Sequence, residues 1–96
     1  MDKYTLSLVE ARILVLASQC PPAENYAEFL AAKLKTDASY TASRLRRLAL
    51  AGLILYERHG RRRIVTNVDK TALEEAKDVL QQQQQQHTQP QAYHYI

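Results

Sequence analysis

The fold is decided by residues 38–66, which read ASYTASRLRRLALAGLILYERHGRRRIVT. The first half of this stretch places Thr41, Leu45 and Leu48 on one narrow face of a helix and puts polar or basic residues on the other. Gly52 predicts where this helix ends, because glycine readily adopts the left-handed conformation that follows many helices. An amphipathic helix with a basic outer surface is therefore expected here.

The second half of the stretch predicts a β-hairpin. Two runs of strand-forming residues, 53–58 and 61–66, are joined by His59-Gly60, and glycine supplies the positive φ of a tight turn. Four arginines crowd the tip of this hairpin, so an anionic partner is expected to offset their repulsion. The implied cross-strand pairs are Glu57 with Arg62, Arg58 with Arg61, Tyr56 with Arg63, and Leu55 with Ile64.

Two further helices are expected before this stretch. Ser7 and Glu10 have the spacing of a capping box, which predicts a helix at Leu8–Gln19, and the two prolines that follow end it. Apolar residues then recur at helical spacing and predict a second helix from about residues 23–26 to Lys35.

A last helix is expected from Asp69, and the glutamines at 81–86 extend it because glutamine has fair helix propensity. Residues 87–96 are low in apolar content and contain Pro90, so disorder is expected there. The predicted organisation is one domain at residues 1–80, with its C-terminal helix from about residue 69. Residues 81–96 form a glutamine-rich tail, partly helical and then disordered.

The charge is concentrated in one segment. The 96 residues carry 13 Lys and Arg against 10 Asp and Glu, a net charge of +3. Residues 33–63 hold nine of the basic residues and two acidic ones, a net +7, whereas the segments on either side each carry −2. Such a basic block is typical of a surface that contacts nucleic acid.

Several classes of protein are excluded or disfavoured. The single Cys20 rules out an internal disulfide, and with the histidines distant from it a metal site is not expected. The longest apolar run, Ile13–Ala17, is too short for a membrane span. No signal peptide is evident, so an intracellular, cytoplasmic location is expected. We find no catalytic motif, and expect no enzyme activity, no cofactor and no small-molecule ligand.

The order of elements, three helices, a β-hairpin and a further helix, resembles the winged helix-turn-helix fold. The resemblance is carried by FLAAKL at 29–34, TASRLRRLALAGLI at 41–54 and YERHGRRRIV at 56–65, and it covers about residues 7–80. It is closest in character to small transcription regulators of archaea and archaeal viruses. It implies an α+β, mostly helical fold with three helices, a two-stranded wing and a C-terminal helix.

The resemblance also implies a function, sequence-specific binding of double-stranded DNA by a homodimer that regulates transcription. The third helix would enter the major groove, where base edges are read by hydrogen-bonding side chains, and the wing would contact phosphates or the minor groove. For a viral protein the location would be the host cytoplasm. The expected DNA-binding residues are Ser39, Tyr40, Ser43, Arg44, Arg46, Arg47, Arg58, Arg61, Arg62 and Arg63.

Each of these residues also has a simpler interpretation. The helix arginines could only solvate an exposed surface, Tyr40 could pack at the rim of the core, and Arg62 could be a structural partner of Glu57. The same fold also serves as a protein–protein interaction module, which would need no DNA.

Self-association is expected through the last helix. Leu73, Ala76 and Leu80 have the spacing of a helix–helix seam, continued by the glutamine run. The alternative is that these three side chains only cover the core of their own chain.

Overall fold

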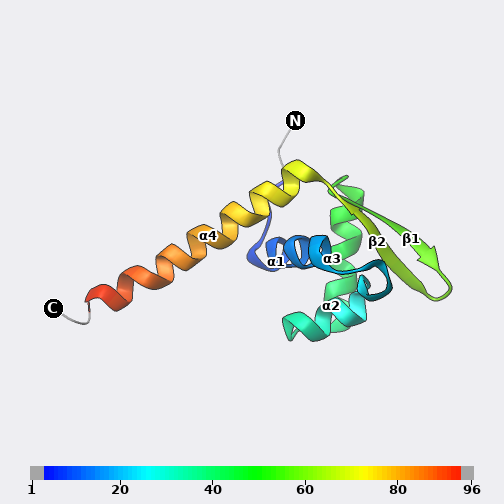
Figure 1. Ribbon diagram of the computed structural model, residues 1–96, viewed down its shortest axis with the longest axis horizontal. Coiled ribbons are helices and arrows are strands. Elements are labelled where there is room, and N and C mark those ends of the chain that lie inside the picture. Colours follow the sequence, from blue (N-terminus) through cyan, green and yellow to red (C-terminus); the bar gives the residue numbers. More distant parts are fainter. Residues whose placement is uncertain (1–3, 94–96) are drawn as a thin grey trace.

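The computed structural model describes residues 4–93, with side chains described to Gln83. This part of the chain is α+β and mostly helical, as predicted, with four α-helices and one two-stranded antiparallel sheet (Figure 1). In chain order the elements are α1 (Leu8–Gln19), the 3-10 turn η1 (Pro22–Glu24), α2 (Ala27–Leu34), α3 (Ala38–Leu50), β1 (Ile54–His59), β2 (Arg62–Val68) and α4 (Lys70–Tyr93).

The start of α1 is fixed by the predicted capping box. Ser7 Oγ accepts a hydrogen bond from the Glu10 backbone N–H at 3.1 Å, and Glu10 Oε1 accepts one from the Ser7 N–H at 3.0 Å. These two bonds satisfy N–H groups that the first turn of a helix leaves without partners. The predicted bounds of this helix, Leu8–Gln19, are confirmed.

The second helix starts later than the sequence predicts. The chain first makes the turn η1, and Asn25 at its end has a φ of −101° and a ψ of 64°, which is not helical, so α2 begins only after it. At its other end α2 closes on Lys35, which is in the left-handed conformation with φ 57°. This sharp closure keeps the link to α3 short.

The third helix follows the sequence prediction closely. Asp37 caps it by accepting a hydrogen bond from the Tyr40 N–H at 2.9 Å. Gly52 adopts a φ of +82° after its end, and the Leu53 N–H then reaches back to the Leu48 carbonyl at 2.9 Å. The chain can therefore turn directly from α3 into β1.

The predicted hairpin is present, but its predicted register is wrong. The two turn residues are Gly60 and Arg61, and Gly60 has a φ of +66°. Glycine thus occupies the first turn position, where a two-residue turn needs a φ that other residues avoid. Neither the favourable pair of Glu57 with Arg62 nor the unfavourable pair of Arg58 with Arg61 exists. The pairs near the tip are His59 with Arg62, Arg58 with Arg63, Glu57 with Ile64, and Tyr56 with Val65.

A β-bulge interrupts the hairpin nearer its base. The register shifts between Leu55 and Tyr56, so that Leu55 pairs with Asn67 and Thr66 has no opposite residue. The Thr66 hydroxyl donates to the Leu55 carbonyl at 3.3 Å across this irregularity. Bulges bend a strand and increase its twist, and sequence alone rarely locates them.

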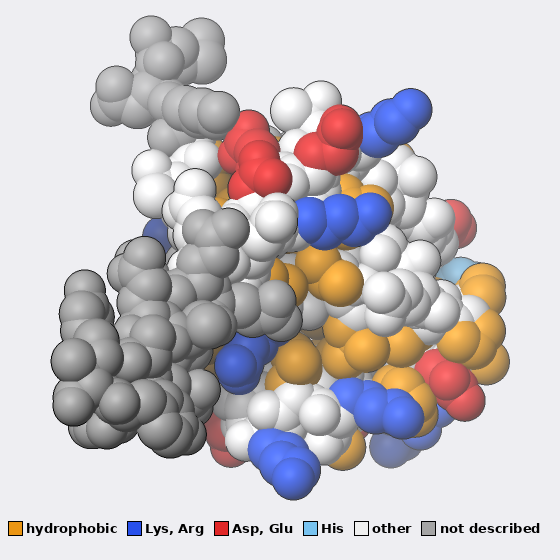
Figure 2. Space-filling model, turned by 60° about the vertical axis from the view of Figure 1, so that its left-hand side comes forward, with side chains coloured by type: hydrophobic (Ala, Val, Ile, Leu, Met, Phe, Trp, Pro, Cys, Tyr) orange, Lys and Arg blue, Asp and Glu red, His pale blue; other side chains and the backbone are white. Residues whose placement is uncertain are grey.

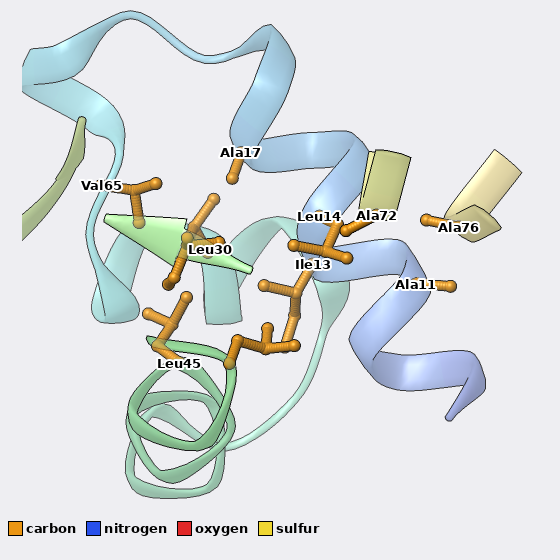
Figure 3. Close-up of a cluster of buried hydrophobic side chains, with 11 residues drawn as sticks. Ala11, Ile13, Leu14, Ala17, Leu30, Leu45, Val65, Ala72 and Ala76 are labelled. Carbon is orange, nitrogen blue, oxygen red and sulfur yellow. The ribbon is translucent and has the colours of Figure 1, made fainter. Parts of the chain in front are cut away.

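The core lies where α1, α4 and the α2–α3 pair meet the base of the hairpin (Figure 3). α1 packs mainly against α4, and α2 packs mainly against α3. Small residues allow the first contact to be close, since Ala11 and Ala76 are fully buried. The largest fully buried side chains are Ile13, Leu14, Leu30, Leu48, Ile54 and Thr41.

Asn25 connects the end of α1 to the hairpin. Its buried side-chain amide donates to the Ala17 carbonyl at 2.8 Å, and its backbone carbonyl accepts from the Val65 N–H at 2.8 Å. One residue of the loop between α1 and α2 therefore holds two other elements at a fixed distance.

The last helix is longer than the sequence predicts. α4 continues through the glutamine run and past Pro90 to Tyr93, where disorder was expected, and it projects away from the other elements (Figure 1). Pro90 lies in the final turn, and it has no N–H to donate to the carbonyl four residues before it. The prediction for residues 94–96 falls outside the described residues. Within residues 4–93, no helix has both the length and the apolar character that crossing a membrane requires.

Candidate nucleic-acid interface

The outer face of α3 carries the predicted polar and basic side chains. Ser39, Ser43, Arg46 and Arg47 are all exposed, because Thr41, Leu45 and Leu48 turn the opposite face into the core. The Asp37 cap fixes where the helix begins, and so fixes which side chains point outward. Hydrogen-bonding side chains on one exposed helix face are the arrangement that major-groove recognition needs.

Arg44 lies between Ser43 and Arg46 in sequence, but its side chain does not share their exposed face. It is half-buried, and its guanidinium Nη1 lies 3.9 Å from Glu10 Oε2 on α1. Its guanidinium carbon also lies 4.9 Å from the centre of the Tyr40 ring. The structure therefore turns Arg44 toward α1, away from the outer face of α3.

Glu10 organises a small polar cluster that the sequence analysis missed. Its carboxylate is 2% exposed and accepts hydrogen bonds from the Ser7 N–H and the Tyr4 hydroxyl, besides facing Arg44. Burial, and then the hydrogen bond to the Glu10 carboxylate, raise the pKa of Tyr4 above its ordinary value. The capping-box spacing pointed to Glu10, but only as a partner within its own helix.

The hairpin arginines are all exposed, yet three of them have partners within the chain. Arg58 Nε donates to the Gly60 carbonyl at 3.2 Å. Arg62 lies over the Tyr26 ring, with 4.1 Å between its guanidinium carbon and the ring centre. Arg63 lies 5.5 Å from the centre of the Tyr56 ring and donates from Nη1 to the Tyr56 hydroxyl at 3.2 Å. Arg61, at the turn, projects without such a support among the described residues.

A groove joins α3 to the hairpin. It has a volume of about 230 Å³ and runs between the start of α2, the middle of α3 and the two strands. Arg46 enters it from the helix, and Arg61, Arg62 and Arg63 enter it from the hairpin. Glu28 is the carboxylate among its lining residues, so the groove is strongly positive. The predicted helix and hairpin sites thus form one continuous surface.

Leu73, Ala76 and Leu80, which were predicted to mediate self-association, are buried to different extents. Ala76 is fully buried in the core of its own chain, as the alternative interpretation had it, so it does not face outward. Leu73 and Leu80 are half-buried against that core. Leu80 lines an open groove with Val15, Leu16 and Leu34, whose rim carries basic residues. Figure 2, which brings the α4 side of the molecule forward, shows apolar side chains lying among Lys and Arg on this side.

The other candidate chemical groups do not form a site. Cys20 is half-buried at the end of α1, and burial raises the pKa of its thiol. Among the residues that the structure describes, no group of three His, Cys, Asp or Glu is placed to hold a metal ion.

Comparison with models of known protein families gives no match, and comparison with curated proteins gives none either. Function is therefore inferred from the geometry of the site. The residue that sequence reasoning missed there is Tyr26, whose contact with Arg62 joins positions far apart in sequence, so no local pattern indicates it. Tyr56 was expected to lie opposite Arg63. It contacts Arg63 in the structure, although the observed turn makes Val65 its opposite residue.

Proposed function

We propose that this chain is a winged helix-turn-helix protein that binds specific sequences in double-stranded DNA as a homodimer and regulates transcription. α3 acts as the recognition helix in the major groove, and the hairpin acts as the wing on the adjacent backbone or minor groove. The observation that carries the proposal is the groove in which Arg46 of α3 meets Arg61, Arg62 and Arg63 of the hairpin. One continuous positive surface fits a duplex, whose phosphates and base edges lie side by side.

The two parts of this surface have different tasks. Ser39, Ser43, Arg46 and Arg47 are exposed along one helix face and can reach base edges, with arginine able to bond guanine through two hydrogen bonds. The hairpin arginines supply phosphate contacts, which position the protein without reading sequence. Arg44, which faces Glu10, contributes through the placement of α3.

Self-association uses the apolar groove between α1, the end of α2 and α4, which includes Leu80. Two copies related by a two-fold axis would present their recognition helices about 34 Å apart, one turn of DNA. The proposal therefore includes a pseudo-palindromic binding site.

The test is a titration of mixed-sequence duplex DNA with the purified protein at several salt concentrations. We expect binding at about 50 mM salt that weakens steeply toward about 200 mM, because each neutralised phosphate releases counterions. Sedimentation equilibrium at the same concentrations measures the oligomeric state. Absence of duplex binding at the lowest salt would sink the DNA proposal, and a monomer on DNA would remove the homodimer from it.

A protein–protein interaction module is the second candidate, and one observation favours it. Leu50 at the end of α3 and Leu55 on β1 are 82% and 62% exposed. A protein partner would cover such apolar side chains, whereas DNA would not need them. Binding that is insensitive to salt and lost in Leu50→Ser or Leu55→Ser would favour this candidate.

A further inference from the structure

We propose that the groove between α3 and the hairpin is a binding site for a single phosphate group, and that Tyr26 and Tyr56 are its positioning residues. The proposal deepens the function above, and rests on it only for the source of the phosphate, the DNA backbone. The site itself is argued from four guanidinium groups and two aromatic rings.

The groove holds more positive charge than the chain itself neutralises. Arg46, Arg61, Arg62 and Arg63 line it, and none of the four has a carboxylate within salt-bridge distance in the described residues. By contrast, Arg44, two residues before Arg46 on α3, does face a carboxylate, Glu10. Guanidinium groups gathered without a counter-charge repel one another, and a bound anion removes that repulsion.

Arg62 is supported by a residue from a different part of the fold. Tyr26 directly precedes α2, and its half-buried ring is further packed against Phe29, with 6.2 Å between ring centres. Arg62 lies over this ring at 4.1 Å, the shortest of the ring–cation distances that the structure gives. A guanidinium on a packed ring loses part of its rotational freedom before any ligand arrives, while its N–H edge stays available.

Arg63 is supported from within the hairpin. The Tyr56 hydroxyl accepts a hydrogen bond from Arg63 Nη1 at 3.2 Å. The centre of the Tyr56 ring lies 5.5 Å from the guanidinium carbon of Arg63. This leaves most of the donors of Arg63 free. Since Tyr56 itself lines the groove, the supported guanidinium is held at the groove and not out in solvent.

The chemistry of these groups favours phosphate over other anions. Arginine presents parallel N–H donors that match two oxygens of a phosphate, and such charge-assisted pairs are stronger than neutral hydrogen bonds. A group with several oxygens can be shared by guanidiniums arriving from the helix and from the hairpin. Two sources offer this chemistry, the backbone of a duplex and free inorganic phosphate.

The first arm of the test uses duplexes that carry one neutral methylphosphonate at a time. The parent duplex is selected from a random pool by the wild-type protein. We expect one position per half-site where neutralisation weakens wild-type binding about tenfold, the loss of one charged hydrogen-bonding contact. In Arg62→Gln and Arg63→Gln, neutralising that phosphate should weaken binding little further, because the guanidinium group that contacts it is already absent.

Matched variants separate positioning from folding. Tyr26→Leu and Tyr56→Phe keep every charge, and each should weaken binding several-fold while reducing the effect of the same methylphosphonate. Lys77→Gln is the charge control, since Lys77 is exposed on α4 and lines neither this groove nor the groove assigned to self-association. It should leave the pattern of sensitive phosphates unchanged. Thermal unfolding of each variant checks that the fold is intact.

The second arm uses inorganic phosphate alone, at constant ionic strength, and follows the side-chain Nε–Hε resonances of the arginines by NMR. Saturable shifts at Arg62 and Arg63 without any duplex binding would keep the phosphate site, assign it to free phosphate and end the DNA proposal. Duplex binding with no methylphosphonate position distinguishing wild type from Arg62→Gln would overturn the site and leave the DNA proposal standing. No response in either arm would overturn both.

Discussion

The α1–α4 side and the α3–hairpin side of this molecule differ in the side chains that they contain. On the α1–α4 side, small and aliphatic side chains such as Ala11, Leu14 and Ala76 are fully buried. On the α3–hairpin side, arginines lie exposed, and the partners of several are tyrosine rings. The contrast teaches that an exposed arginine of α3 or the hairpin can be changed without disturbing a buried aliphatic side chain. A variant that damages one side should therefore spare the other.

The largest effect is expected from Leu14→Ala. Leu14 is fully buried in α1, so truncation leaves a cavity and should lower the free energy of unfolding by about 3–5 kcal/mol. Leu50→Ala is the matched control, because Leu50 is 82% exposed, and it should change stability by less than about 0.5 kcal/mol. Urea denaturation measures both. Equal losses in the two variants would contradict the division between the sides.

The double variant Arg46→Ala with Arg47→Ala should change DNA binding and leave stability unchanged. Both residues are exposed on α3, and losing base contacts worth about 1–3 kcal/mol each should abolish discrimination between the selected duplex and random DNA. The urea midpoint should stay at the wild-type value. Discrimination that survives in this variant would remove α3 from the role of reading helix.

Glu10→Gln tests the contact between Glu10 on α1 and Arg44 on α3, which joins the two sides. The substitution keeps an oxygen for the Ser7 N–H but removes the charge that faces Arg44 and an acceptor for the Tyr4 hydroxyl. We expect a loss of about 2 kcal/mol in unfolding free energy, since the group is buried and charged. Glu74→Gln, an exposed carboxylate on α4, is the control and should be nearly neutral. Equal small losses would mean that the cluster contributes little.

A smaller effect is expected from Arg61→Ala with Arg63→Ala. Binding to all duplexes should weaken about tenfold, because phosphate contacts carry no sequence information. The slope of log K against log salt should fall by about 0.9 for each phosphate contact removed. A change in sequence preference, with an unchanged slope, would contradict the assignment of these residues to the backbone.

The smallest effect concerns alkaline pH. The pKa of Tyr4 is raised in the folded chain above its ordinary value of 10.0, chiefly by burial. The native state therefore holds this proton more tightly than the unfolded state, so the contribution is complete below about pH 10 and is lost as the pH rises above it. The stability difference between wild type and Tyr4→Phe should shrink between pH 9 and pH 11, as measured by urea denaturation. A constant difference would show that Tyr4 does not titrate in this way.

Local signals explain which parts of the fold were predictable. The box of Ser7 and Glu10, with the two prolines, predicted the bounds of α1, and Gly52 predicted where α3 ends, because caps act over one helical turn. The outward face of α3 followed from its periodicity. The two strand-forming runs on either side of Gly60 predicted the hairpin, but the register inferred from them was wrong.

The remaining features depend on contacts between distant residues. The position of Gly60 in the turn and the bulge at Leu55 depend on how the strands settle on the core, and a shift of register reassigns every pair near the tip. The periodicity of α3 places Arg44 at the edge of its outer face, and only the approach of α1 supplies Glu10 as its partner. The contact of Arg62 with the Tyr26 ring likewise depends on how α2 and the hairpin pack together.

Asn25 has a mechanical consequence for any molecule that grips the hairpin. It holds the Ala17 carbonyl at the end of α1 and the Val65 N–H of β2 through a single peptide unit and its side chain. A force that twists the hairpin is therefore transmitted to α1, and through α1 to the helix packed on it. A load that displaces Val65 would therefore also strain the hydrogen bond from Asn25 to Ala17, at the end of the helix that packs on α4.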